Sequence, residues 1–333
     1  VWAEIDLSLN DSGILTFNKK GTTDKNYTAG GYARGKLWGF YSTSTEKTLY
    51  PFNAETFTVV SGDPFTTGKY TVVDLTGAPA TTVTYTKDGR TLTVTDPASL
   101  LYVTSSADGG LLGLLGSNGS INAPYQNNQL LVSDYEGTSS LKLSAITYVG
   151  DLTAKQVRDK NGTYLLDKCD DDTPCHVYYA LTEDDTTNGA TLRQLILVPQ
   201  VDMKDNTPTL SYTLRGSTIG TVAFTDNTST TSMDFWTDGN RYGLLVARNS
   251  GFDDGGSLWK IDITNYAYTE NGILPATEIG GLKTKMVTAL YHKENTSLEY
   301  GQIYNIAGWT MPQSLEASRK AVSAEQGASG DAK

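Results

Sequence analysis

The stretch Thr82-Val-Thr-Tyr-Thr-Lys-Asp-Gly-Arg-Thr-Leu-Thr-Val-Thr95 decides the fold class of this chain. Side-chain character alternates on both sides of Asp88-Gly89, and a period of two is typical of a strand with one exposed face. Asp-Gly is also a dipeptide that matches the twist of a two-residue hairpin turn. The sequence therefore predicts two antiparallel strands joined at Asp88-Gly89.

Tight-turn dipeptides of this kind recur along the whole chain, whereas helical periodicity is short and repeatedly broken by Gly, Thr and Asn. Many short strands separated by turns are therefore expected, and the predicted fold class is all-β. The other Asn-Gly and Asp-Gly pairs begin at Asp108, Asn118, Asn161, Asn188, Asp238, Asp254 and Asn271.

A longer pattern consists of an aromatic-rich strand, a polar turn and a second apolar strand. The last three copies begin about 44–66 residues apart, close to the roughly 40–50 residues of a propeller blade. The five copies are Lys36–Tyr41 with Leu49–Phe52, Gln129–Tyr135 with Leu141–Ile146, His176–Leu181 with Leu192–Leu197, Tyr242–Ala247 with Leu258–Ile263, and Met286–Tyr291 with Tyr300–Ile306.

This pattern resembles the β-propeller architecture, although it carries no Trp-Asp dipeptide, kelch glycine pair or other signature of one propeller family. The resemblance implies a ring of about six or seven small blades over residues 1–310. Two β-sandwich domains are the alternative, because their hairpins give the same local signals. Residues 311–333 differ in composition and are expected to form a polar tail or a weak helix capped by Ser314.

The composition limits the partners of this chain. Its 333 residues are 38% hydrophobic and 19% charged, which is enough apolar material for a sizeable core. The net charge of −11 repels phosphate backbones, so nucleic acid is not expected as a partner. No apolar run reaches the length of a transmembrane helix. Because the chain begins at Val1, we expect that a signal peptide has been removed and that the protein is extracellular or displayed at the cell surface, with an artificially trimmed N-terminus as the alternative.

Two further features fit an extracellular protein. Cys169 and Cys175 flank a short turn and are predicted to form a local disulfide, with two free thiols as the alternative. The predicted glycosylation sites are the six Asn-x-Ser/Thr sequons at Asn10, Asn26, Asn118, Asn161, Asn227 and Asn295.

Carboxylate-rich turns are the one feature that suggests a cofactor. Clustered oxygens on irregular loops suit Ca²⁺, and the candidate ligands are Asp184, Asp185, Asp253 and Asp254. Solvated turn acids are the alternative at each position. The chain has two histidines, His176 and His292, which are expected to be structural because each lies in a strand-like aromatic segment.

Aromatic rings cover sugar faces while amides and carboxylates bind hydroxyl groups, so the composition favours a non-catalytic binding or adhesion module for a glycan or an extracellular protein. The candidate ligand-binding residues are Trp38, Tyr41, Trp236, Asp238 and Tyr242, with core packing as the alternative for each ring. Two other functions stay open: a structural subunit of an extracellular filament or surface assembly, in which copies of the chain contact one another, and a carbohydrate-active hydrolase that uses paired carboxylates.

Overall fold

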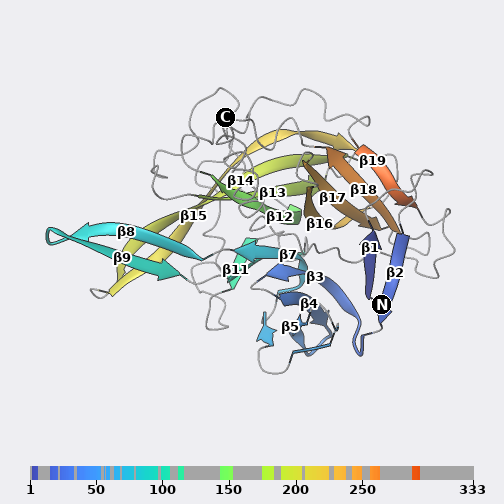
Figure 1. Ribbon diagram of the computed structural model, residues 1–333, viewed down its shortest axis with the longest axis horizontal. Coiled ribbons are helices and arrows are strands. Elements are labelled where there is room, and N and C mark those ends of the chain that lie inside the picture. The colour runs from blue at the N-terminus through green and yellow to red at the C-terminus, as the bar shows by residue number, and fades with distance from the viewer. Residues whose placement is uncertain are drawn as a thin grey trace, which may run out of the picture.

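The computed structural model describes residues 2–6, 16–21, 23–33, 36–53, 56, 58–60, 64–67, 70–78, 80–96, 99–105, 112–115, 143–152, 175–183, 189–204, 207–224, 229–237, 242–249, 256–262 and 287–292. Within these ranges all regular secondary structure is β-strand, and every pair of neighbouring strands is antiparallel (Figure 1). The predicted all-β class is therefore confirmed for the described part of the chain. None of these residues belongs to a helix that could span a membrane.

In the part of the chain that the structure describes, three sheets have four strands each, and in every one the strands are neighbours in the order in which the chain makes them. The first sheet contains β3 (Tyr27–Ala33), β4 (Lys36–Ser42), β5 (Lys47–Phe52) and β6 (Phe65–Thr66). The second contains β12 (Leu143–Leu152), β13 (Cys175–Glu183), β14 (Gly189–Lys204) and β15 (Thr207–Ala223). The third contains β16 (Ser229–Thr237), β17 (Tyr242–Asn249), β18 (Gly256–Asp262) and β19 (Val287–His292).

The remaining strands form smaller sheets. A three-stranded sheet contains β7 (Val72–Ala78), β10 (Ser99–Thr104) and β11 (Leu112–Leu115), with β10 in the middle. One two-stranded sheet pairs β1 (Trp2–Asp6) with β2 (Thr16–Gly21). Another pairs β8 (Thr81–Lys87) with β9 (Arg90–Asp96).

The hairpin expected at residues 82–95 is confirmed. Strands β8 and β9 pair in register from Thr81–Asp96 to Lys87–Arg90. Asp88 and Gly89 both have positive φ, at 52° and 72°, which is the requirement of the type I′ turn that Asp-Gly favours. Three of the five repeated strand pairs are also confirmed, as β4–β5, β13–β14 and β17–β18. The other two include residues outside the described ranges.

The first strands of four sheets, β3, β7, β12 and β16, meet at the centre of the molecule (Figure 1), where β7 lies against the other three and β12 also lies against β16. Each is an edge strand of its own sheet, so one side of its backbone needs partners from elsewhere. Strands β3 and β7 approach closely at Gly31, where a Cβ atom would overlap the carbonyl oxygen of Leu75. Glycine is therefore required at position 31 by the contact between the two strands.

Side chains of β7 accept hydrogen bonds from backbone N–H groups at the edges of β12 and β16. The carboxylate of Asp74 accepts the backbone N–H of Ile146 at 2.8 Å and that of Met233 at 3.2 Å. Thr76, two residues along the same face of β7, accepts the N–H of Tyr148 through its hydroxyl oxygen at 3.0 Å. A buried amide without a partner costs about 1–3 kcal/mol, so these side chains act as a substitute ladder between β7, β12 and β16.

Among the described residues, two apolar clusters pack against these strands. One gathers side chains of β10, β12, β13, β14 and β15, including Leu101, Ile146 and Tyr178, all buried. The other gathers side chains of β3, β4, β5, β7 and β10, including Trp38 and Leu100. Each fully buried large apolar side chain contributes roughly 1.5–3 kcal/mol, so these clusters stabilise the packing of neighbouring sheets.

A ring of blades is not closed by the described residues, so the propeller with six or seven blades stays a prediction. The division of the chain into residues 1–310 and 311–333 also stays a prediction, because the second segment lies outside the described ranges.

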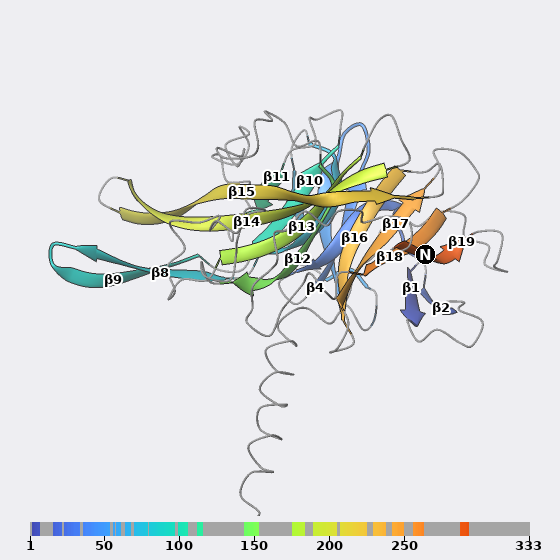
Figure 2. The same cartoon turned by 90° about the horizontal axis from the view of Figure 1, so that it is seen from above.

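The hairpin β8–β9 and the far ends of β14 and β15 extend together from the body of the molecule as one arm (Figures 1 and 2). Thr81 is buried, and its hydroxyl is hydrogen-bonded to Nε2 of His176 in β13, so the odd-numbered face of β8 turns toward the second four-stranded sheet. The opposite face of the hairpin is exposed and consists of three cross-strand threonine pairs, Thr82–Thr95, Thr84–Thr93 and Thr86–Thr91.

Candidate functional site

Trp38 and Tyr41 lie on opposite faces of β4. Trp38 is only 2% exposed, and its ring stacks on Phe65 with the centroids 5.1 Å apart and the planes 15° from parallel. This is the core-packing alternative for Trp38, and it leaves no ring face for a ligand. Tyr41 is three residues further along, so the alternation of the strand places it on the face opposite Trp38. Its ring is partly exposed and has Lys25 as a neighbour.

Tyr41 belongs to a group of partly exposed side chains on the outer face of β3, β4 and β5. The register pairs Tyr27 with Tyr41, and Gly39 with Tyr50, so these residues share one face of the sheet. The group, here called the Lys25 cluster, consists of Lys25, Tyr27, Tyr41, Glu46 and Tyr50.

Gly39 makes the aromatic part of this cluster possible. A Cβ atom at Gly39 would lie 2.9 Å from ring atoms of both Phe52 and Tyr27, which is too close for any side chain. The missing side chain allows the Tyr27 ring to pack edge-on against Phe52, with the centroids 4.8 Å apart. Tyr27 also makes edge contacts with Tyr41 at 6.3 Å and Tyr50 at 6.1 Å, which fixes the three phenols relative to one another.

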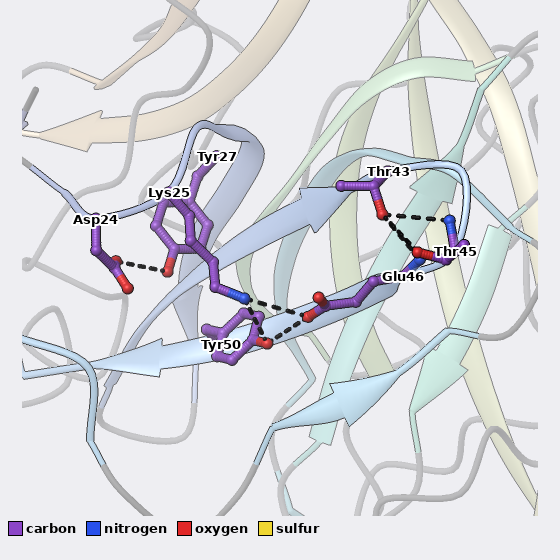
Figure 3. A network of polar contacts seen from close by, with 7 residues as sticks. All are labelled: Asp24, Lys25, Tyr27, Thr43, Thr45, Glu46 and Tyr50. Atoms are coloured by element: carbon purple, nitrogen blue, oxygen red, sulfur yellow. Dashed lines mark hydrogen bonds and ion pairs between the residues drawn. The ribbon is translucent and has the colours of Figure 1, made fainter.

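A tight turn between β4 and β5 positions Glu46. The Thr43 hydroxyl accepts the backbone N–H groups of Thr45 at 3.2 Å and of Glu46 at 2.9 Å (Figure 3). The N–H of Thr43 also donates to the carbonyl oxygen of Glu46 at 2.7 Å. Threonine suits this position because its hydroxyl can satisfy backbone donors two and three residues ahead. The turn holds the Glu46 carboxylate on the same face as the tyrosines.

Lys25 reaches the cluster from a bend that precedes β3. Its Nζ donates to the Tyr50 hydroxyl at 2.9 Å and lies 3.4 Å from Oε1 of Glu46, while the Tyr50 hydroxyl donates to the same carboxylate oxygen (Figure 3). The ammonium also lies 4.3 Å from the centroid of the Tyr41 ring, within the range of a cation–π contact. The resulting arrangement is a triangle of ammonium, phenol and carboxylate beside an aromatic face.

These contacts fix the charge of both ends of the triangle. The hydrogen bond to Tyr50, with Glu46 adding to it, raises the pKa of Lys25 above its usual value. The hydrogen bond from Tyr50, with Lys25 adding to it, lowers the pKa of Glu46. Burial, with the nearby Asp24 carboxylate adding to it, raises the pKa of Tyr27. The site therefore presents a fixed cation, a fixed anion and the neutral phenol of Tyr27 near neutral pH.

The other ligand-binding candidates are only partly placed. Trp236 lies in β16 opposite Gly243, and Tyr242 begins β17 opposite Thr237, so the two residues occupy neighbouring rungs of one ladder. Asp238 lies outside the described residues. Asp234, from the same stretch, accepts the Thr147 hydroxyl at 3.2 Å and its neighbour's N–H, that of Phe235, at 2.8 Å. It links β16 to β12.

The calcium, disulfide and glycosylation predictions remain untested. Among the residues that the structure describes, no three His, Cys, Asp or Glu side chains are placed to hold a metal ion. Cys175 is the first residue of β13, and Asn26 is exposed before β3. Outside the described ranges lie the calcium candidates Asp184, Asp185, Asp253 and Asp254, the cysteine Cys169, and the sequon residues Asn10, Asn118, Asn161, Asn227 and Asn295.

The side chains of His176 and Arg248 are buried and contact residues of neighbouring strands. His176 is 3% exposed, and besides its contact with Thr81 its ring meets Tyr148 edge-on at 6.3 Å. Arg248 donates to the Thr230 hydroxyl at 3.0 Å and lies 3.9 Å from the centroid of the Phe224 ring. Both side chains are buried between strands, which supports a structural role.

No protein-family model matches this chain, and no curated protein matches it.

Proposed function

We propose that this chain is a non-catalytic binding or adhesion module that works outside the cell and recognises a glycan or an extracellular protein through the Lys25 cluster. The observation that carries the proposal is a set of three partly exposed tyrosine rings, grouped with one cation and one anion on the outer face of β3–β5. Rigid tyrosines bury large areas on binding at little entropic cost, and the neighbouring polar groups orient the ligand.

The electrostatics of the cluster support binding rather than proton transfer. A general acid or base works best when its pKa lies near the operating pH. Here the pKa of Glu46 is lowered and the pKa of Lys25 is raised, so each group moves away from neutrality. A hydrolase with paired carboxylates remains the alternative enzyme function, and a glycoside-cleavage screen of the full chain tests it.

We also propose that the sheets are blades of a propeller-like ring of about six or seven blades. Strands β3, β7, β12 and β16 would be the inner strands of their blades. Support comes from the sequential order of the three four-stranded sheets and from the contacts between these first strands. In this arrangement residues 311–333 follow the ring as a tail or weak helix. Two β-sandwich domains are the alternative.

A second candidate function is a structural subunit in which copies of the chain contact one another through the β8–β9 arm. The observation that favours it is the exposed face of six threonines, an uncharged and rigid surface on a chain of net charge −11. Within the described residues, β8 and β9 also pair only with each other, which leaves both outer edges open to a further strand. The solution size of the purified chain tests this candidate, since a monomer at high concentration contradicts it.

A panel of immobilised glycans and extracellular proteins, probed with the wild-type chain, tests the proposed function. We expect at least one ligand to be bound by the wild-type chain and to be bound much less by Tyr41→Ala. Tyr85→Ala is the matched control, because Tyr85 is also a partly exposed strand tyrosine but lies on the arm. A ligand that binds all three proteins equally contradicts the site.

A further inference from the structure

The ammonium of Lys25 sits in a cage, defined here as Tyr41, Tyr50 and Glu46. An aromatic face, a phenol oxygen and a carboxylate converge on the nitrogen, at 4.3 Å from the Tyr41 centroid, 2.9 Å from the Tyr50 hydroxyl and 3.4 Å from Glu46 Oε1. Because Nζ is 4.5 Å from the Tyr50 centroid but 2.9 Å from its hydroxyl, Tyr50 acts mainly as a hydrogen-bond acceptor. Tyr41 supplies the π face. Groups of this kind recognise ammonium ions.

The cage is built on the sheet and does not depend on Lys25 for its position. Tyr41 and Tyr50 lie in β4 and β5, which pair from Leu37–Phe52 to Ser42–Lys47. The Thr43 turn holds Glu46 through backbone hydrogen bonds. Removing the Lys25 side chain therefore leaves the three groups in place.

Lys25, in contrast, enters from outside the sheet. Residues 23–26 precede β3 and pair with no strand among the described residues. Thr23 donates to the carbonyl oxygen of Lys25 at 2.7 Å, a contact within the bend itself, and the Asp24 carboxylate accepts the Tyr27 hydroxyl at 3.4 Å. The Lys25 side chain is 28% exposed and that of Glu46 is 36% exposed, so solvent reaches both. Withdrawal of Lys25 breaks no ladder hydrogen bond.

We propose that the cage is a binding site for an alkylammonium group, that of a lysine side chain on a partner protein, and that Lys25 is a built-in competitor which a partner must displace. This inference rests on the proposed function and narrows it to a protein ligand. A neutral sugar at the same place would leave the Glu46 charge without its cation, whereas an incoming ammonium restores each contact that Lys25 gives up. A site that is already filled also lowers the apparent affinity for an outside ligand.

Opening the cage tests this directly. The variants are Lys25→Ala, which empties the cage, and Lys25→Ala with Glu46→Gln, which empties it and removes the carboxylate. Lys25→Met is a second emptied form that keeps the apolar stem. The probe is n-propylammonium chloride, compared with sodium chloride at equal ionic strength, and binding is followed by calorimetry and by the thermal unfolding midpoint.

We expect both emptied forms to bind propylammonium at least about tenfold more tightly than the wild-type chain, with a rise in the unfolding midpoint of roughly 1–3 °C at saturating amine. The double variant should lose this response. Equal responses of the wild-type chain, Lys25→Ala and the double variant overturn the inference. Because the probe is a simple amine, such a result leaves the Tyr41-dependent binding of the proposed function as a separate question, which the panel decides.

Discussion

The carboxylate of Asp74 in β7 accepts the backbone N–H of Ile146 in β12 at 2.8 Å, across 72 residues of sequence. The same side chain accepts the Ser232 hydroxyl at 2.9 Å and the Met233 N–H at 3.2 Å, both from β16. One buried acid therefore joins the edges of three sheets. The arrangement of the sheets, and with it the position of the Lys25 cluster, depends on contacts of this kind.

Replacing Asp74 should destabilise the protein strongly. Asp74→Ala leaves the amides of Ile146 and Met233 buried without their acceptor, and we expect the free energy of unfolding to fall by about 2–4 kcal/mol. Urea denaturation measures this. Asp88→Asn is the matched control, because Asn-Gly suits the same hairpin turn, and its effect should stay within about 0.5 kcal/mol. Equal stability of the two variants would show that Asp74 does not join the sheets.

The free energy of unfolding should depend on pH through the ionisation of Asp74. Burial raises the pKa of Asp74 well above its usual value, against the opposing effect of the backbone and Ser232 hydrogen bonds. A carboxyl group whose pKa is higher in the folded state than in the unfolded state stabilises the fold fully at pH values below its unfolded-state pKa of about 3.9. This stabilisation is lost as the pH rises through the folded-state pKa. The unfolding free energy of the wild-type chain relative to Asp74→Asn should therefore decrease from pH 4 upward. Parallel profiles for the two proteins would contradict the raised pKa.

Gly31→Ala should be more costly than an ordinary strand substitution. The added methyl group would overlap the carbonyl oxygen of Leu75, which is backbone and cannot rotate away. We expect a loss of about 2–4 kcal/mol in the unfolding free energy, because β3 and β7 must separate. At Gly89 a Cβ atom would meet nothing within 4 Å, and Gly89→Ala should cost only about 1 kcal/mol, from its positive φ. If Gly31→Ala lowers the unfolding free energy no more than Gly89→Ala does, the close approach of β3 to Leu75 of β7 is contradicted.

Expression through a eukaryotic secretory pathway should place a glycan on Asn26. Asn26 is exposed, and Thr28 completes its sequon at the start of β3. Peptide mass mapping before and after glycosidase treatment measures occupancy, with Asn26→Gln as the control, and a non-reducing map in the same experiment reports whether Cys169 and Cys175 are joined. Secreted protein that is unmodified at Asn26 and has reduced cysteines would contradict the extracellular assignment.

Local signals in the sequence predict strands such as those of the β8–β9 hairpin, but they do not predict which sheets pack against one another. The hairpin at Asp88-Gly89 was predictable because its alternation and its turn residues are neighbours in sequence. The partners of Asp74 could not be predicted, since Ile146 and Met233 come together with it only when three sheets converge. No periodicity marks a buried acid of this kind.

The sequence indicates Tyr41 as a candidate but does not indicate the side chains that surround it. Trp38 and Tyr41 were grouped as candidates although an odd spacing of three places them on opposite faces of a strand. The shared face of Tyr41 and Tyr50 required the register of β4 and β5, which the sequence does not define. Lys25 precedes β3, and nothing in its local sequence indicates that it reaches Glu46.

The most direct test of the central claim is the ratio of dissociation constants for the strongest ligand on the glycan and protein panel, measured with Tyr41→Ala and with Tyr85→Ala. The account predicts that Tyr41→Ala binds at least about tenfold more weakly, which corresponds to the loss of about 1.4 kcal/mol, while Tyr85→Ala binds like the wild-type chain. Equal dissociation constants for the two variants, or a wild-type chain that binds nothing on the panel, would contradict a binding function for the Lys25 cluster.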